Sequence, residues 1–135
     1  MVAYSFQKRF VAPIRRGEKA QTIRAERQGR VRHVREGEPM QLYTAMRTRF
    51  CERIIPDPIC AQLQPVMLRF GNAGRIVCII AGGSEIEDRD AFALADGFSG
   101  VREMSDFWFA NHGPMAHFRG VLIRWTTSPA EETKP

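Results

Sequence analysis

The sequence predicts an α+β fold, a small mixed β-barrel flanked by two or three short helices. Three observations support this prediction. The chain has 135 residues, which is about the length of a single domain. Short apolar segments separated by Gly, Pro and polar residues occupy much of the first two thirds, as is typical of strands. Two segments with helical periodicity follow, and an apolar segment comes after them; such a late strand usually pairs near the first and closes the sheet.

The composition is that of a globular domain with its own core. Hydrophobic residues make up 44% and charged residues 26% of the chain, which are ordinary values for such a domain. No apolar run approaches the ~20 residues that a membrane helix needs, and the sequence does not open on a signal-peptide pattern. We therefore expect no membrane partner and a cytoplasmic location. We expect one domain over residues 1–126 and a disordered polar tail over 127–135.

The first forty residues predict two strands, a short helix and a loop. Apolar and aromatic residues at 2–6 indicate the first strand. A helix over 8–16 would bury one apolar face and end at Gly17, because glycine is favoured just after a helix. The second strand is expected over 20–25. The polar, basic segment 27–38, which contains two glycines, is expected to be a mobile loop.

Four apolar segments in the middle of the chain predict a β-meander or a small barrel. They are rich in residues that favour strands and are separated by turn-forming residues. Pro65 is expected to interrupt the third of them, because proline cannot donate a hydrogen bond to a neighbouring strand. The segments cover residues 39–44, 50–55, 59–70 and 75–81.

The last third of the chain predicts two helices and one strand. Acidic residues ahead of 92–95 favour the start of a helix there, and Gly97 is expected to stop it. The second helix is expected over 101–111, with Ser99 as its candidate N-cap. The final strand is expected over 118–125.

The cysteines and histidines do not form a recognisable metal-binding pattern. The cysteines lie among strand-like apolar residues without CxxC spacing, which favours reduced, buried structural thiols over metal ligands or a nucleophile. The histidine spacing does not match a zinc motif either. We therefore expect no metal and no cofactor. The residues concerned are Cys51, Cys60, Cys78, His33, His112 and His117.

Positive charge is concentrated in the N-terminal part of the chain. Residues 1–50 contain twelve Lys or Arg and four Glu, whereas residues 51–135 contain eight basic and eleven acidic residues. Arginine predominates among the basic residues, and its planar guanidinium binds phosphate and stacks on bases. The expected partner is therefore a polyanion, namely RNA, with DNA as a further option. The alternative is a solvated basic face that has no dedicated partner.

The segment 17–24 carries the most specific pattern in the sequence. Gly17, Lys19, Thr22 and Arg24 occupy the fixed positions of G-x-K-x-x-[E/T]-x-R, between the expected first helix and second strand. This pattern resembles the signature of ASCH domains, which are relatives of the PUA RNA-binding fold. The resemblance implies a PUA-like mixed β-barrel. Later segments that agree in outline are 37–43, Ala93, 96–98, Phe107 with Trp108, and 120–125.

Thr22 matches one branch of this family. That branch resembles the bacterial N4-acetylcytidine amidohydrolase and has Thr in place of Glu at the sixth motif position. The resemblance implies that a Lys, a Thr three residues later and a Glu ahead of the last helix are catalytic. Lys19 and Thr22 match residue for residue, whereas the Glu position falls on Asp96. A carboxylate one methylene shorter lies about 1–1.5 Å farther back, and errors of that size can cost a hundredfold in rate.

The same residues are chemically coherent without the family. A threonine hydroxyl is a poor nucleophile until a base removes its proton, and a lysine becomes a base when burial or nearby cations lower its pKa. Lys19 is expected to fold back toward Thr22. Thr22 and Arg24 share one face of an extended strand, so Arg24 is placed to hold an oxyanion or a phosphate. Asp96 would then protonate the leaving amine.

Each of these residues also has a purely structural interpretation. Thr22 has good β propensity, and Lys19 can be a solvated charge after a helix. Arg24 can pair with Glu26 or with Asp96. Asp96 itself can be a turn residue at the end of a helix. These interpretations stay open at the level of the sequence.

Aromatic residues give a further set of candidates. Phe107 and Trp108 follow helical spacing and are expected in the core rather than as a platform for base stacking. Tyr4, Phe6 and Tyr43 are candidates for lining a pocket that accepts a flat base. A small barrel needs aromatic side chains inside in any case.

Two functional hypotheses follow. The first is amide hydrolysis of N4-acetylcytidine, with Lys19, Thr22 and Asp96 as catalytic residues. The alternative is a non-catalytic RNA- or DNA-binding module that uses the same cleft and an arginine-rich loop; a nuclease ranks below both. The candidates for binding substrate or phosphate are Arg9, Arg24, Tyr43 and Arg47. The candidates for binding nucleic acid are Arg27, Arg30, Arg32 and Arg35.

Overall fold

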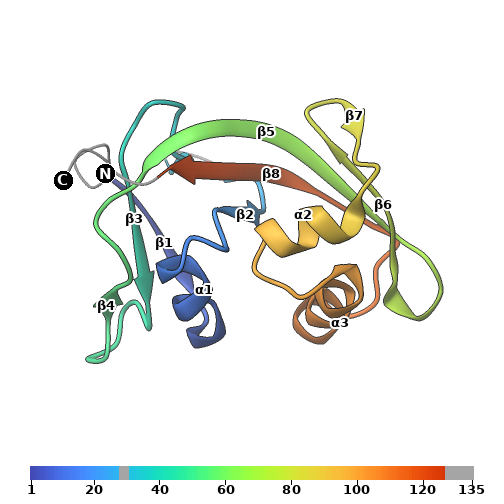
Figure 1. The fold of residues 1–135 in the computed structure, drawn as a ribbon, viewed down its shortest axis with the longest axis horizontal. Helices are drawn as coiled ribbons and strands as arrows, with labels where there is room; N and C mark the ends of the chain where they lie inside the picture. Colours follow the sequence, from blue (N-terminus) through green and yellow to red (C-terminus); the bar gives the residue numbers. More distant parts are fainter. Residues whose placement is uncertain (28–30, 127–135) are drawn as a thin grey trace.

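The computed structural model describes residues 1–27 and 31–126. Arg30 and the expected tail over 127–135 lie outside the described residues. The described chain has an α+β fold, as predicted, with three α-helices and two β-sheets. Figure 1 shows two long strands that arch across the molecule, with two of the helices packed beneath them.

The smaller sheet has the strand order β1-β3-β4. Strand β1 (Val2–Phe6) pairs in parallel with β3 (Met40–Thr44), and β3 pairs antiparallel with the two-residue strand β4 (Glu52–Arg53). The strand predicted over 50–55 is therefore mostly wrong. The residues between β3 and β4 form a loop instead, in which Ala45 and Arg47 have positive φ angles.

The larger sheet has the order β2-β8-β5-β6-β7, and every neighbouring pair is antiparallel. Strands β5 and β8 form its centre and are the two arching strands of Figure 1. The first and last expected strands of this sheet, near 20–25 and 118–125, are confirmed to within a few residues. The strands are β2 (Gln21–Arg24), β5 (Ile59–Phe70), β6 (Ile76–Ala81), β7 (Ser84–Glu85) and β8 (His117–Thr126).

Pro65 does not break β5, contrary to the prediction. Its carbonyl accepts a hydrogen bond from the Gly82 N–H, just after β6. The backbone nitrogen of Pro65, which carries no hydrogen, therefore also faces the end of β6. The ladder between β5 and β6 already stops at the neighbouring pair, Val66 with Ala81. Because the two backbone groups of a residue in an antiparallel strand point to the same side, the proline removes no hydrogen bond to β8.

The two sheets are linked where β3 begins and β5 begins. Pro39 forms an isolated bridge with Ile59, and the Met40 N–H donates to the Pro58 carbonyl. Within the described residues the hydrogen bonds give two sheets of three and five strands. Closure into one barrel therefore stays a prediction.

The helices are short. The expected helix over 8–16 consists of a 3₁₀ turn, η1 (Lys8–Phe10), followed by α1 (Val11–Arg15), and Gly17 follows it with a φ of 79°. A second 3₁₀ turn, η2 (Asn72–Gly74), joins β5 to β6. In the described part of the chain, no helix is both long and apolar enough to cross a membrane.

Helices α2 (Arg89–Ala95) and α3 (Val101–His112) begin at acidic side chains. The Asp88 carboxylate accepts from the Ala91 N–H and caps α2, as the acidic start predicted. Ser99 is not the N-cap of α3, contrary to the prediction. Gly100 holds that position, and Asp90 accepts from the first helical N–H at 2.9 Å.

The core lies between the sheets and the helices. Met104 and Trp108 of α3 are buried in it, as their spacing predicted. Val34, from the segment expected to be a mobile loop, is fully buried in the same cluster. That segment is irregular but anchored in its described part. Cys60 and Cys78 are buried as expected, whereas Cys51 is exposed because it lies in the loop between β3 and β4.

Candidate functional site

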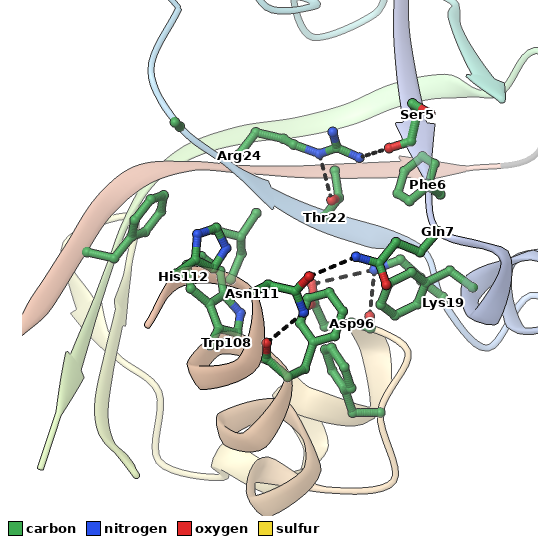
Figure 2. Close-up of a pocket in the computed structure, with 16 residues that line it drawn as sticks. Ser5, Phe6, Gln7, Lys19, Thr22, Arg24, Asp96, Trp108, Asn111 and His112 are labelled. Atoms are coloured by element: carbon green, nitrogen blue, oxygen red, sulfur yellow. Dashed lines mark hydrogen bonds and ion pairs between the residues drawn. The ribbon is translucent and has the colours of Figure 1, made fainter. Parts of the chain in front are cut away.

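A pocket of about 350 Å³ lies between the larger sheet and α3. That volume is in the range of roughly 300–1,000 Å³ that small-molecule sites occupy. Figure 2 shows strand β2 above the pocket, the end of β1 beside it and α3 below it. The lining residues are Ser5, Phe6, Gln7, Phe10, Lys19, Thr22, Ile23, Arg24, Ala25, Asp96, Phe98, Phe107, Trp108, Asn111, His112 and Phe118.

Lys19 lies at the base of this pocket and is only 2% exposed. Its Nζ donates to two backbone carbonyls, those of Gln21 and Asp96. The ammonium also lies 4.7 Å from the centre of the Phe10 ring. The interpretation of Lys19 as a solvated charge is therefore wrong.

The packing around Lys19 requires a glycine at position 97. Gly97 follows α2 with a φ of 100°, and a Cβ there would lie 2.8 Å from Lys19 Cδ and 3.1 Å from a Phe10 ring carbon. Glycine accepts this backbone conformation without the steric cost that other residues incur. The glycine that ends α2 thus also makes room for the lysine stem.

Asp96 faces Lys19 across the pocket base. Its side chain is buried, and Oδ1 lies 3.9 Å from Lys19 Nζ. Asp96 is the C-cap of α2. The residue predicted as the catalytic acid is therefore also a residue at the end of a helix, as its structural interpretation proposed. Lys19 Nζ also donates to the backbone carbonyl of Asp96, so the lysine contacts this residue through both its backbone and its carboxyl group.

Burial changes the acid–base properties of both groups. It lowers the pKa of Lys19 to about 8, against the opposing effect of Asp96 and with smaller contributions from Arg24 and Arg9. Burial also raises the pKa of Asp96 above its ordinary value, and the charge of Lys19 only partly offsets this. Both shifts favour the uncharged forms, since a charged group loses its hydration when buried.

Thr22 and Arg24 lie on the same face of β2, as the strand prediction required. Arg24 Nε donates to Thr22 Oγ1 at 3.1 Å, and another guanidinium nitrogen donates to the Ser5 carbonyl at 2.7 Å (Figure 2). The guanidinium also lies 4.8 Å from the centre of the Phe6 ring. Among the described residues Arg24 forms no ion pair, so the predicted pairing with Glu26 or Asp96 is not seen.

A second set of buried polar groups forms hydrogen bonds that lead to the carboxyl group of Asp96. Gln21 is fully buried, and its Nε2 lies 3.3 Å from Asp96 Oδ1. Its Oε1 accepts from Arg124 Nε at 3.2 Å, and Arg124 also donates to Gln62. Because Arg124 can only donate, the amide of Gln21 must present its NH₂ group to the carboxyl of Asp96.

The mouth of the pocket carries amide and aromatic side chains. Gln7 Nε2 donates to Asn111 Oδ1 at 3.0 Å, which joins the end of β1 to the end of α3. On one wall the His112 ring stacks on Trp108 with centroids 4.4 Å apart. Trp108 is therefore a core residue, as predicted, that also forms part of the wall.

The structure brings together four of the predicted site residues, Lys19, Thr22, Arg24 and Asp96. Arg9 lies just outside, where its guanidinium covers the outer face of the phenylalanines of the pocket and pairs with Glu103 at 3.2 Å.

Tyr43 and Arg47 do not line the pocket. Strand β3 is one strand farther from it than β1, and the Tyr43 ring lies 6.0 Å from the guanidinium of Arg53 instead. Of the other aromatic candidates, Phe6 lines the pocket, whereas Tyr4 is buried in the core and bonds to His33.

The three predicted nucleic-acid-binding arginines that the structure describes do not line the pocket. Arg27 donates to backbone carbonyls and stacks on Tyr4. Arg32 forms a bidentate pair with Glu38 at 3.0 and 3.1 Å, and Arg35 is exposed. Arg30 is outside the described residues.

Sequence reasoning missed four polar residues of the site: Gln7, Gln21, Asn111 and His112. Gln21 lies inside the motif, between Lys19 and Thr22, and a buried strand position occupied by glutamine was a usable signal. Gln7 and Asn111 are distant in sequence, and no local pattern brings them together.

In the part of the chain that the structure describes, no three His, Cys, Asp or Glu residues lie close enough to hold a metal ion. Comparisons with protein-family models, with curated proteins and with solved structures gave no match. The geometry of the pocket is therefore the main basis for a functional hypothesis.

Proposed function

We propose that the protein is an ASCH-type amidohydrolase that removes the acetyl group from N4-acetylcytidine in the cytoplasm. One observation carries this proposal. A buried lysine with a lowered pKa, a threonine, an arginine and a buried carboxyl group share one base-sized pocket. The two linked sheets support the interpretation of the fold as a PUA-like barrel.

The hydrogen bonds of Lys19 suit a general base. A neutral amine has two N–H bonds and one lone pair, and the carbonyls of Gln21 and Asp96 accept two N–H bonds. The lone pair is then free to take a proton. With a pKa of about 8, an appreciable fraction of Lys19 is neutral near pH 7, in contrast to an ordinary lysine.

Arg24 favours the reactive form of Thr22. Its Nε donates to Thr22 Oγ1, so the hydroxyl hydrogen must point elsewhere, and a positive donor stabilises negative charge on that oxygen. The same guanidinium lies where it can stabilise the oxyanion of a tetrahedral intermediate.

The reaction proceeds in two stages. In the first, Lys19 takes the hydroxyl proton as Thr22 Oγ1 bonds to the acetyl carbonyl carbon, which becomes a tetrahedral oxyanion. The C–N4 bond then breaks, and the protonated carboxyl of Asp96 gives its proton to N4. Cytidine leaves, and the acetyl group is an ester on Thr22.

In the second stage, water hydrolyses that ester. Asp96, now ionised, takes a proton from the water as its oxygen bonds to the carbonyl carbon. The bond to Oγ1 breaks, Lys19 returns the proton to Thr22, and acetic acid leaves the pocket. Each group ends in its starting state.

The side chains at the mouth suit the pyrimidine ring of this substrate. Trp108 and His112 offer flat surfaces on one wall, and aromatic surfaces favour stacked bases. Gln7 and Asn111 carry both donors and acceptors. They bond to each other in the free pocket, and on binding they would turn to the polar edge of the base.

The test is turnover of N4-acetylcytidine by the purified protein, followed by chromatographic separation of cytidine. We expect Thr22→Val to lower kcat by at least about a hundredfold, because the nucleophile is lost while the side-chain shape is kept. Thr22→Ser keeps a hydroxyl and should retain measurable activity. Circular dichroism and a thermal melt confirm that each variant is folded.

Two results would contradict the proposal. One is the absence of cytidine from wild-type protein at high concentration. The other is a Thr22→Val variant as active as the wild type.

A non-catalytic nucleic-acid-binding module is the second candidate function. The surplus of arginines in the first fifty residues favours it. It predicts RNA binding that weakens steeply with salt, because counterions are released from each phosphate contacted. In that case Thr22→Val leaves binding unchanged, and turnover is absent.

A further inference from the structure

The loop between β3 and β4, residues 45–51, presents an exposed aromatic ring among arginines. Phe50 is 69% exposed, more than Phe109, the other exposed phenylalanine of the described chain. The guanidinium of Arg49 lies 4.9 Å from the centre of that ring. Arg47 and Arg49 are both exposed, and neither forms an ion pair within the described residues.

Hydrogen bonds of Thr48 stabilise the conformation of the loop. The Thr48 N–H and hydroxyl both donate to the Ala45 carbonyl, and the hydroxyl oxygen accepts from the Phe50 N–H. Arg47 sits at a φ of 67°, in the left-handed region that glycine occupies most easily. The loop thus presents an arginine side chain at a position where the backbone alone would favour glycine.

Strand pairing places this loop beside the mouth of the pocket. Strands β1 and β3 are parallel, and Phe6 pairs with Thr44, so both chains leave the sheet at the same edge. The next residue after Phe6 is Gln7 of the pocket mouth, and the next after Thr44 is the first residue of the loop. In Figure 1 the β3–β4 hairpin lies beside α1, which Arg15 confirms by donating to the Ile54 carbonyl.

Basic side chains lie on the segment 8–16, which comprises η1, α1 and the C-cap of α1. Lys8 follows directly on Gln7, and in the described residues it has no ion-pair partner. Arg9, Arg15 and Arg16 each have one exposed carboxylate partner, at 3.2, 3.8 and 2.9 Å. Such exposed pairs exchange readily for phosphate, since surface ion pairs are weak.

We propose that the β3–β4 loop and the basic segment 8–16 bind single-stranded RNA next to the nucleotide that occupies the pocket. This inference rests on the proposed function and specifies its substrate class, namely N4-acetylcytidine within an RNA strand rather than the free nucleoside. Arg47 and Arg49 bind phosphates, and Phe50 stacks on a flanking base. A single strand is required because a paired base cannot enter the pocket.

The experiment compares two substrates, free N4-acetylcytidine and a nine-nucleotide RNA of eight uridines with N4-acetylcytidine at the centre. We expect wild-type kcat/KM to be at least about tenfold higher for the RNA, because stacking and phosphate contacts add to binding. The double variant Arg47→Ala/Arg49→Ala should lose most of that advantage and keep its activity on the nucleoside. The slope of log affinity against log salt for RNA binding should fall by about 1.4, because each phosphate contact to a single strand contributes about 0.7.

The matched control is Arg69→Ala/Arg75→Ala. These exposed arginines border the turn between β5 and β6, at the opposite end of the molecule in Figure 1. The control removes the same charge, so a general electrostatic effect would lower RNA activity equally in both double variants. Phe50→Leu tests stacking separately: it keeps an apolar side chain and should lower RNA binding about fivefold or more.

RNA binding is also measured by fluorescence anisotropy with the Thr22→Val variant. This measurement does not depend on turnover. Loss of RNA affinity in Arg47→Ala/Arg49→Ala and not in the control supports the loop, even if no deacetylation is found and the proposed function fails. Equal affinity of both double variants, or no preference of the wild type for RNA over nucleoside, overturns the loop proposal and leaves the proposed function standing.

Discussion

The pocket and the segment 31–38 each contain two Lys or Arg residues, but the surroundings of these residues differ. In the pocket, Lys19 is buried against an acid that only partly compensates its charge, and its pKa falls to about 8. In the segment 31–38, Arg32 is exposed and meets Glu38 in a bidentate pair that lowers the pKa of the carboxylate. The motif predicted the first region to be functional and the surplus of arginines predicted the second, but burial distinguishes them.

The difference in burial between the two regions determines where a cationic side chain becomes reactive. An exposed arginine that is paired with a carboxylate, as Arg32 is with Glu38, is solvated, so its removal changes stability little. A buried lysine has lost its hydration and holds its proton weakly, so it can act as a base. The predictions below test this contrast, beginning with the largest expected effect.

The largest effect is expected at Lys19. Lys19→Ala removes the general base and should lower the kcat for N4-acetylcytidine by about 10²–10⁴-fold. Added ethylamine should restore part of the activity, because it fits the space left by the side chain and supplies an amine. Steady-state kinetics with and without the amine measure both effects.

A structural role for Lys19 would give another result. The variant would lose activity together with its cooperative melt, and ethylamine would restore neither. Ethanol at the same concentration has nearly the same size but no amine, and it is the matched control for an effect of filling the space alone.

The next effect is a dependence of stability on pH. Lys19 has a pKa of about 8 when folded and an ordinary value of 10.5, so between these values the unfolded state binds more protons. Stability from this group therefore rises with pH from 8 to 10.5, by about 3 kcal/mol, and is lost again as pH falls through 8. Urea unfolding at pH 7.5 and 10 should show this gain in the wild type relative to Lys19→Ala.

Asp96 acts in the opposite direction. Its pKa is raised in the folded state, so its contribution to stability is fully present below pH 3.8 and is lost as pH rises through its folded pKa.

Parallel stability curves for wild type and Lys19→Ala above pH 8 would contradict the lowered pKa of Lys19. Activity should increase with pH toward 8, since the neutral lysine is the base.

A smaller effect is expected from a matched pair of glycines. Gly17 and Gly97 both have positive φ angles, but a Cβ at Gly17 would meet nothing within 4 Å, whereas one at Gly97 would crowd Lys19 and Phe10. Gly17→Ala should cost about 1 kcal/mol, the backbone penalty alone. Gly97→Ala should cost about 2–4 kcal/mol, because overpacking is added.

Thermal and urea denaturation measure these two costs. Gly97→Ala should also lower turnover, because it displaces the lysine stem, and Gly17→Ala should not. Equal costs at both positions would mean that the packing around Lys19 is looser than described.

The smallest effect is expected at Arg32. Arg32→Ala breaks an exposed pair with Glu38 and should leave turnover and RNA binding unchanged. Its melting temperature should fall slightly and less so in high salt, which screens exposed charges. A large loss of RNA binding in this variant would favour the arginine-rich loop over the pocket as the functional region.

Most of the elements were predictable from the sequence because their signals are local. Residues close in sequence determine three of these features. They are the end of α1 at a glycine, the start of α2 at acidic residues and the helical spacing of α3. Pro65 was misjudged because its effect depends on which side of β5 faces the end of β6. The strand over 50–55 was overestimated because its apolar residues lie in the exposed loop before β4 and in the core after it.

The candidate site was predictable only in part. Lys19, Thr22 and Arg24 lie within six residues, so a strand prediction was enough to relate them. Asp96 came from the family resemblance, and the structure places it 3.9 Å from the lysine. Gln7, Asn111 and the support of Gln21 by Arg124 depend on contacts between distant segments, which no local pattern encodes.

The pairing of β2 with β8 determines when the pocket can form. Gln21 pairs with Arg124, 103 positions later in the chain, and contacts so distant in sequence form slowly in folding. During synthesis, β2 has no partner until β8 has been made. Lys19 is therefore an ordinary hydrated lysine in the growing chain, and it becomes buried, with a lowered pKa, only when nearly the whole domain is assembled.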